Sequence, residues 1–287
     1  MTDVFPVVAG TDGSAKASAA VDEAAAFAQM RGLPLTLLYG FAPLYGYAGF
    51  DPTPPAEILD ACQKVVDGEV ERVRSAHPEL VVKSAVPIAD PAIALVDASA
   101  DASAVFVGAR GLGAVRRLLL GSVSTKVATY AKCPTFVVRG PVGDPHGPVV
   151  IGISPEYGSP EALHFGFAYA RERGLAVRVI QAQQHVAANF DYLPPDVMRE
   201  VIEDQIHAAE ERAQHAFEAV AVDYPDVHAS LDILPGHAVD ALLDAAKEAS
   251  LVVVGKHGAH NVAARLLGSV TLGVLGSAPF VAVIPSQ

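Results

Sequence analysis

Cysteine is scarce in this sequence: the 287 residues include two, Cys62 and Cys133, and no CxxC motif. Two cysteines are too few for a disulfide framework and fit a reducing compartment, so we expect a cytoplasmic protein. Positive charge is scarce too, with 20 Lys and Arg against 32 Asp and Glu. Because a net charge of −12 repels phosphate backbones, we expect no nucleic-acid partner.

The sequence also lacks a secretory leader and a long apolar run. Its first residues contain no basic segment followed by an apolar core. The uncharged stretch 32–50 is interrupted by prolines and glycines, whereas a spanning helix needs about 20 continuous apolar residues, so we predict no membrane span. With 51% hydrophobic and 18% charged residues, the chain is typical of a packed globular protein, and its length suits two domains.

What the sequence does contain is one pattern written twice. Three landmarks recur in the same order, namely VVAGTD at 7–12 as VVIGIS at 149–154, VFVG at 105–108 as VVVG at 252–255, and LLGSV at 119–123 as LLGSV at 266–270. Repeated landmarks at similar offsets indicate a duplicated unit. We predict one domain at 1–140, a Gly- and Pro-rich linker at 141–148, and a second domain at 149–287.

Within the first copy, short β-branched runs alternate with helical patterns. The predicted strands are 4–10, 33–40, 80–86, 104–107 and 135–139, and the predicted helices are 15–31, 55–76, 91–100 and 123–131. Continuous apolar strands separated by helices indicate a parallel sheet covered on both faces. The predicted fold is α/β, with two tandem doubly wound five-stranded parallel sheets whose ligands bind at the carboxyl ends of the strands.

A spaced set of glycines follows the fourth strand of each copy. In the first copy, two residues separate Gly108 from Gly111, and nine more separate Gly111 from Gly121-Ser122. Gly255, Gly258 and Gly268-Ser269 repeat this spacing in the second copy. Glycine lets backbone amides approach a phosphate, and a helix that opens at the last pair points its amides at an anion. Nearby cations could add contacts, namely Arg110, Arg116, Arg117, Lys256 and Arg265.

This pattern resembles the ATP-binding G-2x-G-9x-G(S/T) signature of the universal stress protein family, in the tandem form common in actinobacteria. The resemblance covers nearly the whole chain and implies an adenine nucleotide alpha-hydrolase-like, Rossmann-like fold with ATP and Mg²⁺ as ligands. The ATP-binding residues implied in the first copy are Gly10, Asp12, Gly40, Phe41, Gly108, Arg110, Gly111, Gly121, Ser122, Val123 and Ser124. Those implied in the second copy are Gly152, Ala182, Gly255, Gly258, Gly268, Ser269 and Val270.

The second copy departs from the family pattern at one position. Ser154, followed by Pro155, stands where the resemblance implies an acidic contact to the nucleoside, a place that Asp12 fills in the first copy. Losing a charged hydrogen bond costs about 1.5–3 kcal/mol, roughly ten- to a hundredfold in affinity. We expect a weaker second site or one with an altered nucleoside preference.

Other interpretations of these residues stay open. The glycine pairs could be simple turns, and Asp12 could be the cap of the 15–31 helix, a ligand contact, or both. The pairs His257/His260 and His207/His215 lack a third ligand at a convincing spacing, so we predict no metal site of their own. The loops 41–55 and 186–195 could fold over a nucleotide or be surface excursions.

The function implied by the resemblance is regulatory: ATP binding that alters the binding of an unidentified partner protein. We expect no enzymatic activity beyond weak hydrolysis, because no carboxylate other than Asp12 stands near the glycine loop. The alternatives are a slow ATPase or phosphotransferase, and an interaction module that no longer binds nucleotide. In the family the last strands, here 135–139 and 280–284, pair across interfaces, and a homodimer of the chain is a further prediction. The preference among ATP, ADP and AMP stays open.

Overall fold

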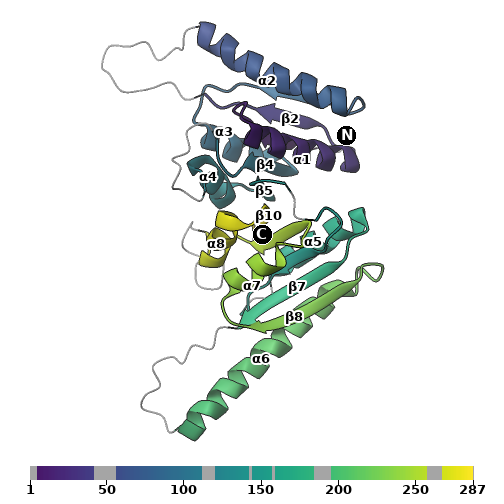
Figure 1. Ribbon diagram of the computed structural model, residues 1–287, viewed down its shortest axis with the longest axis vertical. Helices are drawn as coiled ribbons and strands as arrows, with labels where there is room; N and C mark the ends of the chain where they lie inside the picture. Colours follow the sequence, from purple (N-terminus) through teal and green to yellow (C-terminus); the bar gives the residue numbers. More distant parts are fainter. Residues whose placement is uncertain are drawn as a thin grey trace, which may run out of the picture. The chain divides into compact units, whose positions relative to one another are not determined.

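The computed structural model describes residues 5–41, 56–111, 120–141, 144–156, 159–183, 195–256 and 267–286. The chain forms two compact units, Met1–Pro141 and Val142–Gln287. Both are built from alternating strands and helices (Figure 1).

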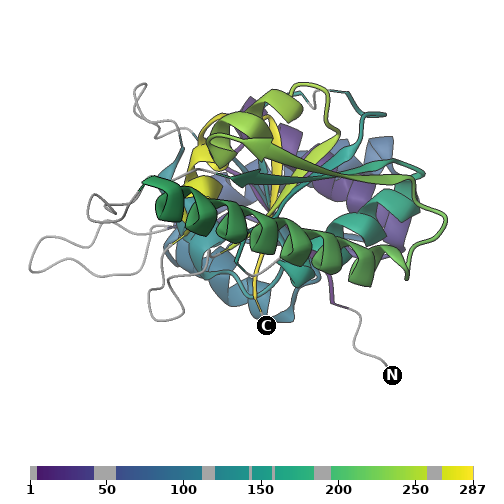
Figure 2. The ribbon, with the colours of Figure 1, turned by 90° about the horizontal axis from the view of Figure 1, so that it is seen from below.

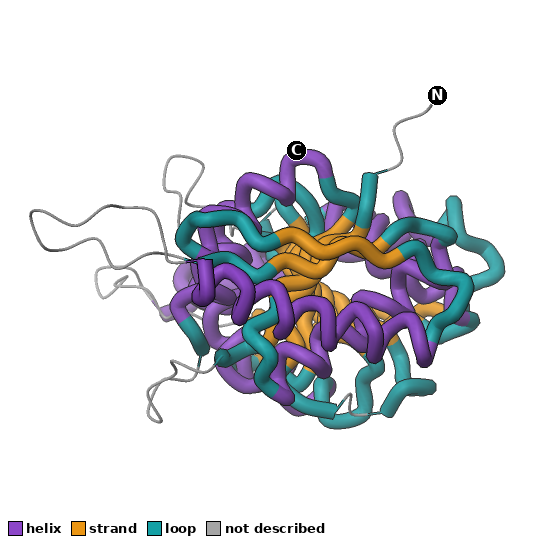
Figure 3. Tube along the Cα trace, turned by 90° about the horizontal axis from the view of Figure 1, so that it is seen from above, coloured by secondary structure: helices purple, strands orange, loops and turns teal. Residues whose placement is uncertain are grey.

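Unit 1 contains a parallel sheet of five strands in the order β3-β2-β1-β4-β5. The strands are β1 (Val7–Gly10), β2 (Leu35–Leu38), β3 (Val82–Ala85), β4 (Ala104–Gly108) and β5 (Thr135–Val138). The helices are α1 (Ala15–Arg31), α2 (Ala56–Ala76), α3 (Pro91–Ala98) with the short 3-10 helix η1 (Ser99–Asp101), and α4 (Ser122–Tyr130). Since α1 contacts α2 and α3 contacts α4, the sheet lies between two helical layers (Figure 3).

Unit 2 repeats this arrangement in the order β10-β9-β6-β7-β8, again with parallel pairing. Its strands are β6 (Val149–Gly152), β7 (Val177–Gln183), β8 (Ala229–Pro235), β9 (Leu251–Gly255) and β10 (Phe280–Ile284). Its helices are α5 (Pro160–Arg173), α6 (Pro195–Ala221), α7 (Ala238–Ala245) and α8 (Ser269–Ser277). The long helix α6 contacts β7 and β8, while its first turns extend beyond the strands (Figures 1 and 2).

The core of unit 1 follows from its sequence. The strands β1, β4 and β5 are buried almost throughout, as expected for a sheet covered on both faces. Phe106 of β4 stacks on Phe136 of β5 at 4.2 Å between ring centroids, and Phe27 of α1 packs against both rings. Small buried side chains such as Ala24 let α1 lie close to the sheet.

The predicted elements are all present, with ends that shift by a few residues. The helix 15–31 and the strand 280–284 have the predicted bounds. The third helix, predicted to reach residue 100, ends at Ala98 and tightens into η1. The reason is local: the Ser99 hydroxyl donates to the Val96 carbonyl oxygen at 2.5 Å and accepts the Lys132 backbone N–H at 2.9 Å.

Candidate functional site

In both units the strand order reverses at the same place in the fold. In unit 1, β1 lies between β2 and β4, and in unit 2, β6 lies between β7 and β9. The helices that follow the strands on either side of this point leave toward opposite faces, so a crevice opens at the carboxyl ends. The predicted residues Gly10, Gly108, Gly152 and Gly255 end the four strands concerned.

The turn after β1 positions the Asp12 carboxylate. Asp12 Oδ1 accepts the Ser14 backbone N–H at 3.0 Å, which fixes the carboxylate within the turn. The N-cap of α1 is Ser14, whose Oγ accepts the Ala17 N–H at 3.3 Å. The interpretation of Asp12 as the helix cap is therefore wrong: it stabilises the turn before the cap, and its Oδ2 atom faces another way.

Asp12 Oδ2 faces Gly111, which follows β4. A Cβ added to Gly111 would lie 2.3 Å from Asp12 Oδ2, so only glycine allows the carboxylate to occupy this place. The first and fourth strands thus bring together two residues that lie far apart in the sequence. The result is a half-buried carboxylate at the edge of the sheet.

The start of α4 is tied to the end of β4. The Gly121 N–H donates to the Ala109 carbonyl oxygen at 2.8 Å, and the buried Ser124 hydroxyl donates to the same oxygen at 3.1 Å. Gly121 is the N-cap and makes no side-chain cap bond, and Ser122 and Val123 are the first helical residues. The helix N-terminus is therefore held at the sheet edge, where its dipole favours an anion. The Ser124 side chain therefore holds the start of α4 at the end of β4 through its hydrogen bond to the Ala109 carbonyl oxygen.

The end of β2 forms another wall of the same edge. A Cβ on Gly40 would lie 2.4 Å from Pro91 Cα, so the strand end and the start of α3 approach closely. The Phe41 N–H donates to the Pro87 carbonyl oxygen at 3.1 Å. Burial raises the pKa of Tyr39, and its hydrogen-bonded neighbour Cys62 and the charge of Asp12 raise it further. The phenol of Tyr39 therefore lies near the Asp12 carboxylate.

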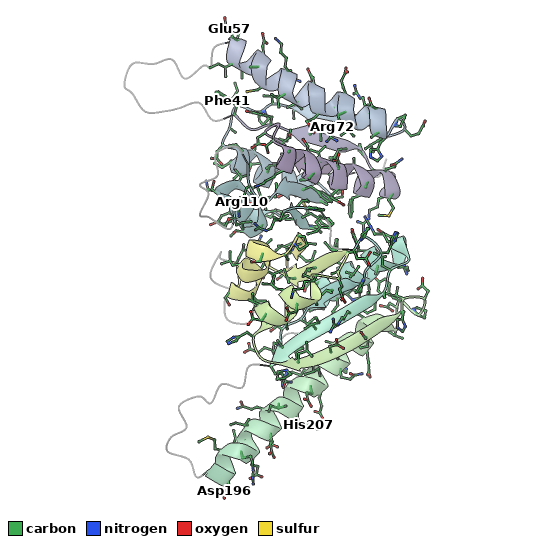
Figure 4. The ribbon with its side chains drawn as sticks, viewed as in Figure 1. Phe41, Glu57, Arg72, Arg110, Asp196 and His207 are labelled. Carbon is green, nitrogen blue, oxygen red and sulfur yellow. The ribbon has the colours of Figure 1, made fainter. Side chains whose placement is uncertain are left out.

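Two arginines follow neighbouring strands of unit 1. Arg110 comes after β4 and Arg139 after β5, and burial together with the charge of Arg110 lowers the pKa of Arg139. Arg110 is half-buried, and its Nε is a buried donor without a hydrogen-bond partner among the described residues. Phe41 and Arg110 lie at the same edge of the unit (Figure 4). Two adjacent positive charges at this edge favour an anion there.

Unit 2 has a cavity at the corresponding edge, with an empty volume of ≈ 700 Å³ that includes space open to solvent. Six of the seven residues predicted in the second copy line it, namely Gly152, Ala182, Gly255, Gly268, Ser269 and Val270. The seventh, Gly258, lies outside the described residues, as do Arg116, Arg117, His257, His260 and Arg265 and most of the loops 41–55 and 186–195. Lys256 is 8% exposed and does not line the cavity.

The cavity has nine further lining residues, of which the sequence had placed only Ser154 at the nucleoside contact: Ile153, Ser154, Pro155, Ser159, Ile180, Ala238, Leu242, Val254 and Thr271. The repeat could have revealed Thr271, since it corresponds to Ser124, and its hydroxyl donates to the Gly255 carbonyl oxygen at 2.8 Å. The apolar wall of Ile180, Leu242 and Val254 carries no such signal, because an unbroken apolar run does not show which side chains face a cavity.

The turn after β6 uses hydroxyl groups. Ser154 Oγ accepts the Glu156 N–H at 3.2 Å, and Ser159 Oγ accepts the Ser154 N–H at 3.4 Å. Ser159 has φ 47°, a left-handed conformation that costs a non-glycine residue about 1–3 kcal/mol. Strain of this kind persists where the surrounding structure fixes the residue. Ser159 is one of the residues that line the cavity.

The described residues contain neither a candidate metal site nor a candidate membrane-spanning helix. No group of three or more His, Cys, Asp or Glu side chains in this part of the chain could hold a metal ion. Likewise, no helix among the described elements is both apolar enough and long enough to cross a membrane.

The described geometry is that of a doubly wound, Rossmann-like α/β protein with one ligand edge in each of two repeated units. A family model described as the universal stress protein family matches residues 5–139 and 146–284. A universal stress protein of Mycolicibacterium smegmatis is 31% identical over 293 residues, which cover 96% of this chain and 94% of that protein. The chain therefore belongs to the universal stress protein family.

Solved structures agree on the fold. The crystal structure of a universal stress protein from Archaeoglobus fulgidus DSM 4304 matches with TM-score 0.69 at 18% identity, covering 99% of this chain and 97% of that chain. This likeness shows the doubly wound, Rossmann-like α/β fold. A universal stress protein solved in complex with cAMP is 25% identical, covers 48% of this chain and 99% of that chain, and has TM-score 0.39, so it places no ligand here.

Proposed function

We propose that this protein binds ATP, with Mg²⁺, at the carboxyl edge of each sheet. The observation that carries the proposal is the cavity of unit 2, which gathers six residues implied by the family resemblance from β6, β7, β9 and the start of α8. In unit 1, the Asp12 carboxylate, the start of α4 and the Arg110–Arg139 pair supply the corresponding polar groups.

The test is to purify the protein without added nucleotide, denature it, and identify and count what is released. We expect adenine nucleotide, up to two per chain, and a reduced count for Gly121→Ala, whose Cβ would lie 3.2 Å from the Ala109 carbonyl oxygen. Gly68→Ala is the matched control, since nothing lies within 4 Å of its Cβ. An empty protein that is also not stabilised by Mg-ATP would reject the proposal, because ligand at 100 times its Kd contributes about 2.7 kcal/mol.

We further propose that nucleotide occupancy regulates the binding of a partner protein. A ligand shifts a conformational equilibrium by its differential affinity for the two states, so the nucleotide must bind one state more tightly. Partner capture is compared for the wild type with and without ATP and for Gly121→Ala. Equal recovery in all three would contradict this regulatory role. Homodimer formation stays a prediction, and sedimentation velocity tests it.

We propose that binding, and not turnover, is the activity. Phosphoryl transfer needs a positioned metal and a group that orients the nucleophile. Among the described residues that line the cavity of unit 2, no side chain is a carboxylate or a histidine. A turnover above about 1 per second, the lower end of usual enzyme rates, would overturn this assignment and favour the ATPase or phosphotransferase alternative.

A further inference from the structure

The outer edge of the unit 2 sheet is formed by β8, whose seven residues pair with β7 along their whole length. At the start of the strand, the Val177 N–H donates to the His228 carbonyl oxygen at 2.8 Å. At its end, the Gly236 N–H donates to the Gln183 carbonyl oxygen at 3.0 Å. Successive residues of a parallel strand direct their N–H and C=O groups to alternate sides, so the even-numbered residues of β8 face β7. The odd-numbered residues direct theirs away from the sheet, namely Ala229, Leu231, Ile233 and Pro235.

These outward backbone groups are open to a new partner. Among the described residues, no hydrogen bond is made by the outward N–H groups of Ala229, Leu231 and Ile233. Pro235 has no N–H, and it stands at the edge position where the missing donor costs the sheet nothing. An edge strand with free N–H and C=O groups is a template to which another strand can add.

The corresponding edge of unit 1 is shorter and partly occupied. Its edge strand β3 has four residues, of which Val82 and Ser84 direct their backbone groups outward. Arg74 of α2 donates from Nη2 to the outward Val82 carbonyl oxygen at 2.9 Å. When the repeats are aligned on the proline that precedes each edge strand, Arg74 corresponds to Ala221, which offers no side-chain donor. The longer edge of unit 2 therefore lacks the arginine that occupies the edge of unit 1.

The helix beside the β8 edge is acidic. Carboxylates outnumber basic side chains along α6, which contacts β8 and runs beside it (Figures 1 and 2). Three of these carboxylates line a groove together with Ile233 of β8, namely Glu210, Glu211 and Glu218. The other residues of the groove are Gln214 and His215. A segment lying along the edge on this face of the sheet therefore meets negative charge.

We propose that the outer edge of β8 binds an extended basic segment of a partner protein, which adds to the unit 2 sheet as a further strand. Main-chain hydrogen bonds to the outward groups of Leu231 and Ile233 hold the segment, as in other complexes formed by strand addition. Its side chains alternate between the two faces, so every second one lies over the groove. Lys or Arg at these positions complements the carboxylates of Glu210, Glu211 and Glu218.

Charge also argues against a second copy of this chain at the edge. Pairing β8 with β8 of another copy would bring two acidic α6 helices to the same face of the joined sheet, and juxtaposed like charges disfavour an interface. The inference goes beyond the proposed function, because no described residue of β8 or α6 lines the nucleotide cavity. Peptide binding at the edge and nucleotide binding in the cavity can therefore be measured separately.

The direct test titrates the full chain with a fluorescent peptide of alternating Lys and Val, about eight residues long to match an average strand. Fluorescence anisotropy should show saturable binding that weakens with added salt, and no binding of the peptide with Glu in place of Lys. Methylation removes amide donors, and only one alternate set of peptide amides faces β8. Methylating that set should abolish binding, and methylating the other set should leave it unchanged. Equal effects of the two sets, or no saturable binding of the Lys peptide, would overturn the inference.

A proline in β8 tests the edge from the protein side. Leu231→Pro removes one outward N–H and no hydrogen bond to β7, because the backbone of Leu231 faces away from the sheet. We expect a loss of roughly tenfold in affinity for the Lys peptide. Leu231→Ala is the matched control, since it shortens the side chain and keeps the N–H. Equal affinities of the two variants would contradict binding through the backbone of β8.

Charge reversal tests the chemistry of the partner. One variant combines Glu210→Lys, Glu211→Lys and Glu218→Lys in the groove. Its matched control combines Glu200→Lys, Glu203→Lys and Asp204→Lys nearer the start of α6, which changes the net charge equally but leaves the groove intact. The groove variant should lose about tenfold in affinity for the Lys peptide, and the control much less. Equal losses would show that net charge and not the groove attracts the peptide, and would overturn the assignment of a basic partner.

Two further measurements keep the outcomes distinct. A wild-type dimer in sedimentation velocity that becomes monomeric in Leu231→Pro would assign the edge to a second copy and overturn the inference. Unfolding curves of each variant separate a loss of binding from a loss of fold, and the methylated peptides need no variant. Failure of the peptides to bind would leave the ATP proposal intact, whereas a protein that binds the Lys peptide but no nucleotide would reject only the proposed function.

Discussion

The two units fill the same place in their cores with different residues. Their first helices both end at a left-handed glycine, Gly32 and Gly174, so Ala24 of α1 corresponds to Gly166 of α5. The strand residues beneath them, Ala9 and Ile151, correspond through their register with β2 and β7. Unit 1 uses two alanines, whereas unit 2 pairs a large strand residue with a glycine. Unit 2 thus accommodates a large strand residue by leaving the helix position without a side chain.

At the ligand edge the same comparison has a different outcome. Replacing Asp12 by Ser154 keeps the turn and its hydrogen bond. The backbone is therefore nearly indifferent to the exchange, but the group offered to a ligand changes from a charged acceptor to a neutral hydroxyl that can donate as well as accept. A duplicated fold can in this way retain its architecture while its two sites diverge in chemistry.

The largest effect should come from changing the Ile151–Gly166 pair, in which a large strand residue packs against a helix position that has no side chain. A Cβ on Gly166 would lie 2.4 Å from Ile151 Cδ1, so Gly166→Ala overpacks unit 2 and should cost about 1–3 kcal/mol. Ile151→Ala should cost about 2–5 kcal/mol. The double variant recreates the unit 1 pair, so its cost should be about 0.5–3 kcal/mol less than the sum. Urea unfolding measures the stability of all three variants. If the two single costs simply add up in the double variant, positions 151 and 166 are not coupled.

A second effect should separate the two ligand sites. In Gly111→Ala the new methyl group displaces the Asp12 carboxylate, because a Cβ at this position would lie 2.3 Å from Oδ2. We expect the first site to lose about ten- to a hundredfold in ATP affinity, the cost of one charged hydrogen bond, while the second site is unaffected. Calorimetry with Mg-ATP resolves the two sites. Equal weakening of both sites would show that they are not independent.

Much of this comparison could be predicted from the sequence, because the two units repeat one sequence pattern. Apolar runs between helical patterns predicted the parallel sheets, and the family resemblance carried by the glycine spacing implied six residues that line one cavity. The string Thr11–Ser14 was ambiguous, since Thr, Asp and Ser can each cap a helix, and the cap proved to be Ser14. The apolar wall with Leu242 depends on which face a buried side chain takes, which only tertiary packing decides.

A smaller effect concerns the helix caps. Asp90→Ala should destabilise unit 1 by about 1 kcal/mol, because two N–H groups of α3 lose their acceptor. His237→Asp should stabilise unit 2 by a similar amount, since the N-cap of α7 makes no side-chain bond. Thermal unfolding measures both changes. Asp90→Asn retains the acceptor without the charge and is the control.

The smallest effect tests the neighbourhood of Asp12 through pH. Tyr39 and Gln181 occupy matching positions after β2 and within β7, and only Tyr39 can ionise. Burial, Cys62 and Asp12 raise the pKa of Tyr39 in the folded state. A raised pKa contributes stability that is fully present below the unfolded value of about 10 and is lost as pH rises through the folded value. The stability difference between wild type and Tyr39→Phe should therefore fall as pH rises above about 10, as measured by urea unfolding. Gln181→Met, which alters no ionisable group, should shift stability equally at every pH, and a Tyr39→Phe difference that is flat with pH would show that folding does not raise the pKa of Tyr39.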